Sequence, residues 1–341
     1  MEHKTRIEWI DFARGIVMLL VIWGHIDTEY MPFFTWTNAI KLPGFFAISG
    51  YFFSVNKDKL SMILKKKVRA LIAPYFFLGG ISIAVSYLFK MISGETFTVD
   101  LILSFALGKE FWFIPCLFVS FLILILLFKI FDGKINHIIA ASIIILVIGC
   151  VIIRQGTVRI WRWDTALIAQ FFVMSGYIYK NIIEPSVIKF VNEGIATLII
   201  AVVYIGLIFI SENTKYGFLV DMNLNQYSNI IICLLACMLG ILLLFSISKL
   251  IFNNKNPFCK SIEFVGKNTL CYFILSFQCM HLTERLVTAF QNKLFLVRND
   301  LLSDIIVFIC VCLELAVISV TINRYFPFII GKRRPAMKSQ P

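Results

Sequence analysis

The sequence alternates from end to end between long apolar stretches and short polar or charged segments. The apolar stretches are about 16–23 residues long, close to the length that an α-helix needs to cross the hydrocarbon core of a bilayer. No run shows the apolar–polar alternation of an outer-membrane β-strand. The pattern predicts an all-α polytopic membrane protein of about ten transmembrane helices, centred on residues 12–30, 36–54, 70–90, 111–129, 136–153, 165–180, 195–211, 228–250, 267–283 and 302–323.

The segments between these stretches are short, which leaves no room for a second domain. We predict a single transmembrane domain over residues 1–331 and a basic cytoplasmic tail over 332–341. The first apolar run is long enough to stay in the membrane and lacks the small-residue cleavage site of a signal peptide.

One short motif occurs twice, as FFAISGY at residues 45–51 and as FFVMSGY at residues 171–177. A match of seven positions is weak evidence for an internal repeat in an apolar sequence. A Ser–Gly pair inside an apolar helix, however, lets another helix or a ligand come close to the backbone. Ser49 and Gly50 are therefore candidate contacts for a bound molecule as well as for a helix.

Composition supports the membrane class. The chain is 59% hydrophobic and 15% charged, whereas soluble domains have about 45–50% apolar and about 25% charged residues. Lys and Arg concentrate on one side of the predicted spans, which predicts a cytoplasmic (inner or plasma) membrane protein with both termini in the cytoplasm. The net charge of +12 is thus a topological signal with affinity for anionic lipid, and we expect no nucleic-acid partner.

The nine cysteines lie mostly inside apolar stretches, and their spacing resembles neither a zinc site nor a disulfide framework. We expect them to pack between helices, and we expect no metal cofactor.

Arg14 and His25 are the most informative residues. Eleven residues on one helix place the two side chains roughly 20° apart and about 16 Å apart along the axis, with Arg14 near one surface and His25 well inside. Asp11 can pair with Arg14 at i, i+3. Arg14 can also be an interfacial arginine and His25 a hydrogen-bonded core histidine. The functional alternative is a catalytic pair, with His25 as a general base or acyl carrier that Asp27 and Glu29 could orient.

A second basic group, Lys65, Lys66, Lys67 and Arg69, opens the third span. The three lysines suit positive-inside anchoring. Arg69 lies deeper, next to apolar residues, and its planar guanidinium suits phosphate oxygens. A phosphorylated cytoplasmic small molecule is therefore a candidate ligand.

Two aromatic groups are placed on the opposite side of the membrane. Trp112 precedes the fourth span, and Trp161, Arg162 and Trp163 form an outer loop. Trp and Arg could stack on and hydrogen-bond a sugar, although interfacial tryptophan is also common. Lys41 and Glu314 are further charges inside apolar spans and could line a cavity.

These residues together resemble the acyltransferase-3 family of integral membrane O-acyltransferases, nearest its fucose-O-acetylase-like branch. The resemblance rests on Arg14-x10-His25, on Ser49-Gly50-Tyr51, on Arg69 before Pro74, on Trp112-Phe-Ile, and on Gly266-Lys-Asn-Thr-Leu270. It covers essentially the whole chain, and the ordered set is more specific than any single motif.

The resemblance implies transfer of an acyl group, usually acetyl from acetyl-CoA, to a hydroxyl of a cell-surface or lipid-linked glycan. It implies His25 and Arg14 as the essential pair and Arg69 as part of the donor site. The chain departs from the family at Ser276, where members often have a histidine, and His281 follows five residues later.

The leading interpretation is thus a membrane O-acetyltransferase. CoA would bind near Arg14, Arg69 and Lys65–Lys67, with Ser49 and Gly50 beside its pantetheine arm, and the glycan near Trp112, Trp161, Arg162 and Trp163. The alternative is a transporter or flippase of a glycolipid or polyprenyl-linked sugar, which embedded charges would also suit. A purely structural membrane subunit explains neither His25 nor Arg69.

Overall fold

The computed structural model describes residues 7–26, 31–54, 60–94, 98–154, 159–186, 193–215, 217–294 and 300–332. This part of the chain is mostly helical, which confirms the predicted all-α fold. It forms two compact units. Unit 1 comprises Met1–Asp58 and Val119–Thr269, and unit 2 comprises Lys59–Phe118 and Leu270–Pro341.

The helices and strands follow one another along the chain as α1 (Glu8–Ile26), α2 (Met31–Tyr51), α3 (Leu60–Lys67), the π-helical turn η1 (Val68–Ile72), α4 (Ala73–Ile92), α5 (Asp100–Ala106), α6 (Phe113–Ile130), α7 (Ile135–Ile153), the 3-10 turn η2 (Ile160–Arg162), α8 (Trp163–Ile178), the π-helical turn η3 (Tyr179–Ile183), α9 (Glu184–Ser186), α10 (Glu193–Glu212), β1 (Val220–Asp221), β2 (Gln226–Tyr227), α11 (Ile230–Ile251), α12 (Pro257–Lys267), α13 (Thr269–Leu294), α14 (Asp300–Tyr325) and the 3-10 turn η5 (Pro327–Ile330).

Eight helical segments of the described chain are long and apolar enough to cross a membrane. They coincide with eight of the predicted spans. The other two predicted spans, 36–54 and 267–283, coincide with α2 and α13, and their crossing of the bilayer stays a prediction, as does the cytoplasmic position of both termini. The antiparallel β1–β2 hairpin and the amphipathic helix α12 are elements that the hydropathy pattern did not predict.

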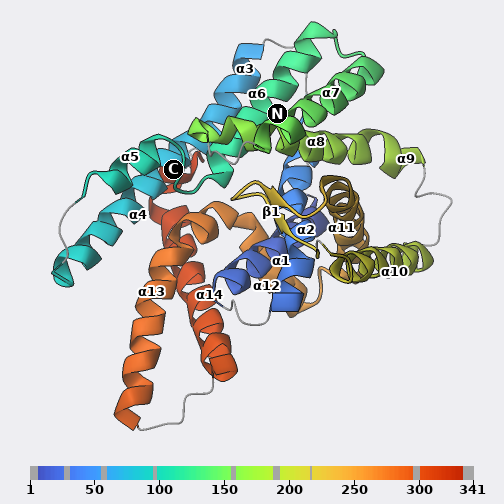
Figure 1. Ribbon diagram of the computed structural model, residues 1–341. Coiled ribbons are helices and arrows are strands. Elements are labelled where there is room, and N and C mark those ends of the chain that lie inside the picture. Colours follow the sequence, from blue (N-terminus) through green and yellow to red (C-terminus); the bar gives the residue numbers. More distant parts are fainter. Residues whose placement is uncertain are drawn as a thin grey trace, which may run out of the picture. The chain divides into compact units, whose positions relative to one another are not determined.

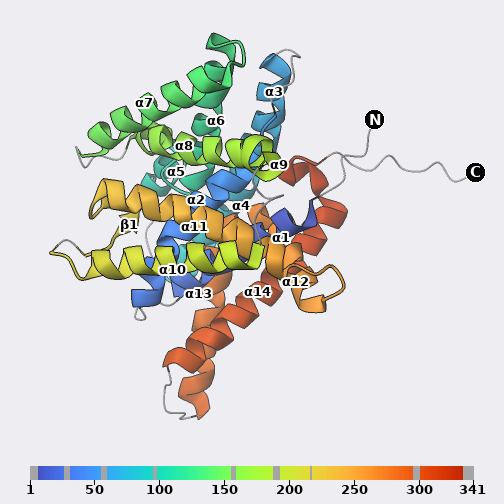
Figure 2. The same ribbon diagram turned by 90° about the vertical axis from the view of Figure 1, so that its right-hand side faces the viewer.

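In unit 1, α1 packs on α12, α2 packs on α8 and α11, and α10 packs on α11 (Figures 1 and 2). The contact between α1 and α12 depends on two glycines. A methyl group at Gly15 would lie 2.0 Å from the carbonyl oxygen of Ile262, and one at Gly266 would lie 1.7 Å from that of Asp11. The Gly266 motif therefore holds α12 against the first turns of α1, beside Arg14.

In unit 2, side-chain hydrogen bonds join α4, α13 and α14. The Ser82 hydroxyl of α4 donates to the carbonyl oxygen of Ile274 at 3.3 Å, and the Tyr272 hydroxyl of α13 donates to that of Cys312 at 3.1 Å. Tyr75 stacks on Phe105 of α5 with ring centroids 4.7 Å apart, and its hydroxyl donates to the Phe105 carbonyl. These bonds let hydroxyl groups sit among apolar helices because each finds an acceptor.

Each unit has a π-helical turn in its described part, and each of these turns lies just before a proline. In η1 the Ala73 N–H donates to the carbonyl oxygen of Val68, and Pro74 follows. In η3 the Glu184 N–H donates to that of Tyr179, and Pro185 follows. Proline has no N–H to continue the regular ladder, and its ring crowds the preceding turn, so the backbone widens there.

Candidate functional site

Arg14 and His25 lie on α1, an unbroken helix of 19 residues. The predicted ion pair is confirmed, because Arg14 Nη1 lies 3.4 Å from Asp11 Oδ1. The Arg14 guanidinium also lies 5.2 Å from the centre of the Phe52 ring. α1 spans Glu8–Ile26, so His25 occupies its last turn, with an exposed side chain. The depth of His25 in the bilayer stays a prediction. Asp27 and Glu29 lie outside the described residues.

His25 has a buried cation as an electrostatic neighbour. Lys41, on α2, is 5% exposed and acts on both His25 and Asp221 of β1. Two residues after Lys41, Pro43 interrupts the hydrogen-bond ladder of α2. We call His25, Lys41 and Asp221 the His25 cluster. The sequence suggested Lys41 only as a cavity-lining charge and did not indicate Asp221 at all.

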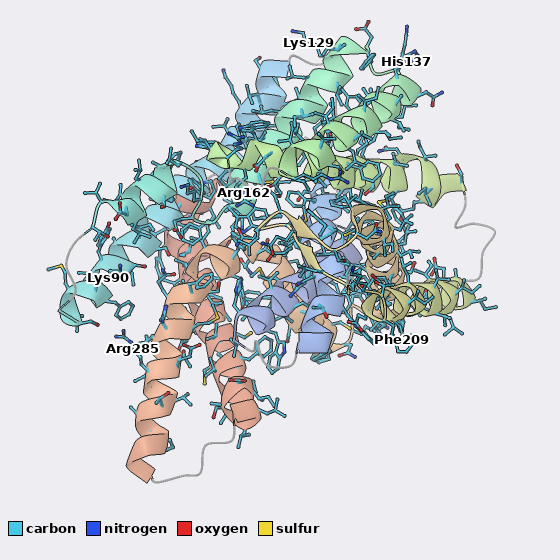
Figure 3. The ribbon with its side chains drawn as sticks, viewed as in Figure 1. Lys90, Lys129, His137, Arg162, Phe209 and Arg285 are labelled. Atoms are coloured by element: carbon cyan, nitrogen blue, oxygen red, sulfur yellow. The ribbon has the colours of Figure 1, made fainter. Side chains whose placement is uncertain are left out.

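Arg162 holds the hairpin that carries Asp221. Its side chain is buried, and Nη2 donates to the carbonyl oxygen of Met222 at 3.0 Å and to that of Asn223 (Figure 3). These carbonyls belong to the turn that follows Asp221. Arg162 therefore positions one member of the His25 cluster, because its guanidinium donors are directed to the hairpin.

The neighbours of Arg162 show why that segment is unusual. Trp161 and Arg162 both have left-handed backbones with φ of 54°, which turns the chain into α8. Trp161 is half-buried, whereas Trp163 is 41% exposed. Binding of a sugar by Trp161, Arg162 and Trp163 stays a prediction, and the structure gives Arg162 a positioning role in addition.

Charged and aromatic side chains also gather at the Tyr51 end of α2. The Tyr51 hydroxyl donates to Glu184 Oε2 at 2.7 Å, and Lys249 Nζ lies 2.5 Å from Glu184 Oε1. The same Nζ lies 4.7 Å from the centre of the Trp9 ring and 5.3 Å from that of Tyr179. Attraction to ring faces and a carboxylate keeps this ammonium stable at an apolar boundary. The sequence signal that could have indicated this ion pair is the presence of Glu184 and Lys249 at the ends of two apolar spans.

The repeated Ser–Gly motif is a helix contact. A methyl group at Gly50 would lie 1.8 Å from the carbonyl oxygen of Val173 on α8. This confirms the close helix approach that the motif suggested, because α8 fills the space on the Cβ side of Gly50. That side leaves no room for a pantetheine arm, and donor binding by Ser49 and Gly50 stays a prediction. Ser49, the preceding residue, is half-buried.

In unit 2, Arg69 lies in the π-helical turn η1 with an exposed side chain. Its Nε–H donates to the carbonyl oxygen of Gly331 at 2.9 Å. Gly331 has a φ of 71°, which favours glycine. Within the described chain no further hydrogen bond involves the Arg69 guanidinium, so its terminal amino groups are available to bind a phosphate. Lys65 and Lys66 are exposed and Lys67 is half-exposed on the preceding turn of α3.

Trp112 precedes α6 in unit 2 and is half-buried, with its ring edge-on to Phe113 at 6.3 Å. The preceding turn is fixed by Tyr75, whose hydroxyl lies 3.2 Å from the carbonyl oxygen of Glu110. Burial raises the pKa of the Glu110 carboxyl above its ordinary value. The loop is thus ordered, and binding of a glycan by Trp112 stays a prediction.

Among the described residues, no three His, Cys, Asp or Glu side chains come together to hold a metal ion. The candidate groups for chemistry are the His25 cluster in unit 1 and the basic turn around Arg69 in unit 2.

Comparison with known proteins adds one finding. The model of the acyltransferase-3 family, described as an acyltransferase domain, matches residues 7–324. No curated protein and no solved structure matches the chain. The match covers nearly all of the sequence, including α1 with Arg14 and His25 and the turn with Arg69. The chain therefore belongs to the acyltransferase-3 family.

Proposed function

We propose that this membrane acyltransferase moves an acetyl group from acetyl-CoA to a hydroxyl of a cell-surface or lipid-linked glycan, as in the fucose-O-acetylase-like branch of the family. The feature that supports the proposal is the electrostatic interaction between the exposed imidazole of His25 and the buried ammonium of Lys41. A general base can take the proton of a hydroxyl, and a buried cation can stabilise the oxyanion that acyl transfer to this hydroxyl creates.

In this proposal His25 takes the proton of the acceptor hydroxyl while the hydroxyl oxygen attacks the thioester carbonyl. The negative charge that develops on the carbonyl oxygen is stabilised by Lys41, whose burial strengthens its field. The tetrahedral intermediate then expels the thiolate of CoA, which takes the proton back from His25. The products are the glycan ester and CoA, and no acyl-histidine is needed.

The donor would be recognised by its phosphates. The fork of Arg69, already oriented through Gly331, gives directional hydrogen bonds, whereas Lys65–Lys67 add a diffuse positive field. Within unit 1, Arg14 and His25 are about 16 Å apart along α1, a distance that a pantetheine arm can span. The charged nucleotide stays at the surface, because burial of its phosphates would be far too costly.

Family membership favours an acyltransferase over the transporter or flippase that embedded charges also suggested. Trp161 and Trp163 are proposed to contact the sugar, Trp163 through its exposed ring.

The proposal is tested by the acetyl content of surface glycans from cells that carry the intact gene, no gene, or a His25→Ala variant. We expect His25→Ala to match the cells without the gene while the protein still accumulates in the membrane. His137→Ala is the matched control, because His137 is exposed and stacks only on Phe131 among the ring contacts of the described chain. Near-normal acetylation with His25→Ala would remove this residue from the mechanism.

A further inference from the structure

Unit 2 contains two adjoining cavities of opposite character. The larger has a volume of about 980 Å³ and is walled by α4, α13, α14 and η5. The smaller, of about 360 Å³, lies between the last turns of α4 and the middle of α13. Phe89 and Gln278 line both cavities, so the two adjoin at these side chains.

The smaller cavity is cationic. Lys90 comes from α4, and His281 and Arg285 come from one face of α13, one turn apart (Figure 3 labels Lys90 and Arg285). The Arg285 guanidinium lies 5.9 Å from the centre of the Phe89 ring, which places it at the junction with the larger cavity. None of the described residues that line the smaller cavity is acidic, and hydroxyl groups come from Ser86 and Ser93. Three basic groups with two hydroxyls suit a phosphate.

The larger cavity is apolar, with walls that include Leu78, Val85, Leu282, Leu313 and Val317. An opening of this kind in a membrane protein suits a hydrocarbon chain, because apolar walls gain nothing from a soluble ion. Its acidic lining residue, Glu314, accepts a hydrogen bond from the Thr283 hydroxyl at 3.0 Å.

Gln278 sits at the junction. Its Nε2 donates to Ser86 Oγ at 3.1 Å and to the carbonyl oxygen of Ser82 at 3.3 Å. Its Oε1 is buried and accepts no hydrogen bond from the described chain. Buried acceptors are normally satisfied, so this oxygen would be completed by a donor group carried by a bound molecule.

We propose that the two cavities together bind one anionic lipid whose negative charge is on a phosphate, with the phosphate between Lys90, His281 and Arg285 and the hydrocarbon chain along α13 and α14. Charge selects the head group, and the continuous apolar wall distinguishes a lipid from a free anion. The inference deepens the proposed function, on which it rests in one respect: a lipid-linked glycan acceptor would be held here by its carrier phosphate.

Lipid binding can be measured on the purified full-length protein by native mass spectrometry, with phosphatidylglycerol, phosphatidylcholine, a polyprenyl phosphate and inorganic phosphate as separate probes. We expect Arg285→Gln to weaken binding of phosphatidylglycerol and polyprenyl phosphate about tenfold, because one charge-assisted contact is lost. Lys109→Gln is the control, since Lys109 is an exposed cation of unit 2 outside both cavities. This variant should bind both anionic lipids as the intact protein does.

A second variant tests the chain site. Val317 is exposed on α14 and lines the apolar cavity, so Val317→Trp should fill it and weaken the binding of both anionic lipids about tenfold. Ile309 is exposed on the same helix outside the cavity, so Ile309→Trp should leave their binding unchanged. Equal binding of phosphatidylcholine and phosphatidylglycerol, or full competition by inorganic phosphate, would overturn the proposal.

These measurements need no acyl donor. Loss of lipid selectivity and loss of acetyl transfer by His25→Ala are therefore separate outcomes.

Discussion

Gly50 and Gly176 each lie against the backbone of the helix that carries the other. A methyl group at Gly50 would lie 1.8 Å from the carbonyl oxygen of Val173, and one at Gly176 would lie 1.8 Å from that of Ala47. The two copies of the repeated motif thus form a reciprocal contact between α2 and α8. Close backbone approach of this kind is how small residues hold membrane helices together.

This contact predicts that Gly50→Ala destabilises unit 1 by about 1–3 kcal/mol, because the new methyl must push α8 away. The measurement is the thermal unfolding midpoint of the purified protein in detergent. Gly206→Ala on α10 is the control, since nothing lies within 4 Å of its added methyl. That change should leave the midpoint unchanged or raise it, because alanine favours a helix. Equal midpoints for the two variants would contradict the contact.

Lys41 is predicted to act in the chemical step. We expect Lys41→Met to lower kcat for acetyl transfer about 10²–10³-fold, the cost of removing one oxyanion-stabilising group, with little change in KM for acetyl-CoA. Lys41→Arg should recover part of the rate because it keeps the positive charge. A matching loss of thermal stability in Lys41→Met, with kcat per folded molecule unchanged, would assign Lys41 a structural role instead.

Arg69 and Lys66 are predicted to contribute to donor binding in different ways. Arg69→Lys should weaken acetyl-CoA binding about tenfold, because an ammonium cannot reproduce a forked contact with phosphate. Lys66→Gln should weaken it only slightly, and that small effect should vanish in high salt. Titration calorimetry at two salt concentrations measures both effects. The specific phosphate contact would be refuted if the two variants behaved alike.

Glu263 on α12 is predicted to make unit 1 sensitive to acid. Burial alone would raise the pKa of its carboxyl, but hydrogen bonds from Lys267, at 2.5 Å, and Lys260, at 3.0 Å, outweigh burial and lower the pKa below the ordinary 4.5. Because the pKa of Glu263 is lower in the folded state than in the unfolded state, its charge stabilises the protein at a pH above the unfolded-state pKa. This stabilisation is lost as the pH falls through the folded-state pKa.

Thermal unfolding of the intact protein and of Glu263→Gln between pH 7 and pH 3 checks this sign. We expect the variant to unfold at a lower temperature at pH 7, and the gap to close as the pH drops below about 4.5. A gap that stays constant with pH would show that the charge of Glu263 does not stabilise α12.

The sequence by itself determined the features that arise within one helix. The length of the apolar stretches predicted the membrane-spanning helices, since a helix lets an unbroken apolar run satisfy its backbone hydrogen bonds within itself in a bilayer. The Asp11–Arg14 pair and the common helix of Arg14 and His25 followed from helical spacing. The predicted span 12–30 overlaps α1, which the structure describes over Glu8–Ile26, because hydropathy gives the centre of a helix better than its ends.

Only the tertiary structure decided which distant residues meet. Lys41 and Asp221 join His25 from α2 and from a hairpin whose two-residue strands carry no apolar periodicity. Arg162 resembled a sugar-binding side chain in the sequence, yet in the fold it bonds to carbonyl groups about 60 residues later. The cationic cavity likewise joins Lys90 to Arg285 through the packing of α4 on α13. Such contacts depend on how whole helices pack, and the spacing of residues within one segment does not determine that packing.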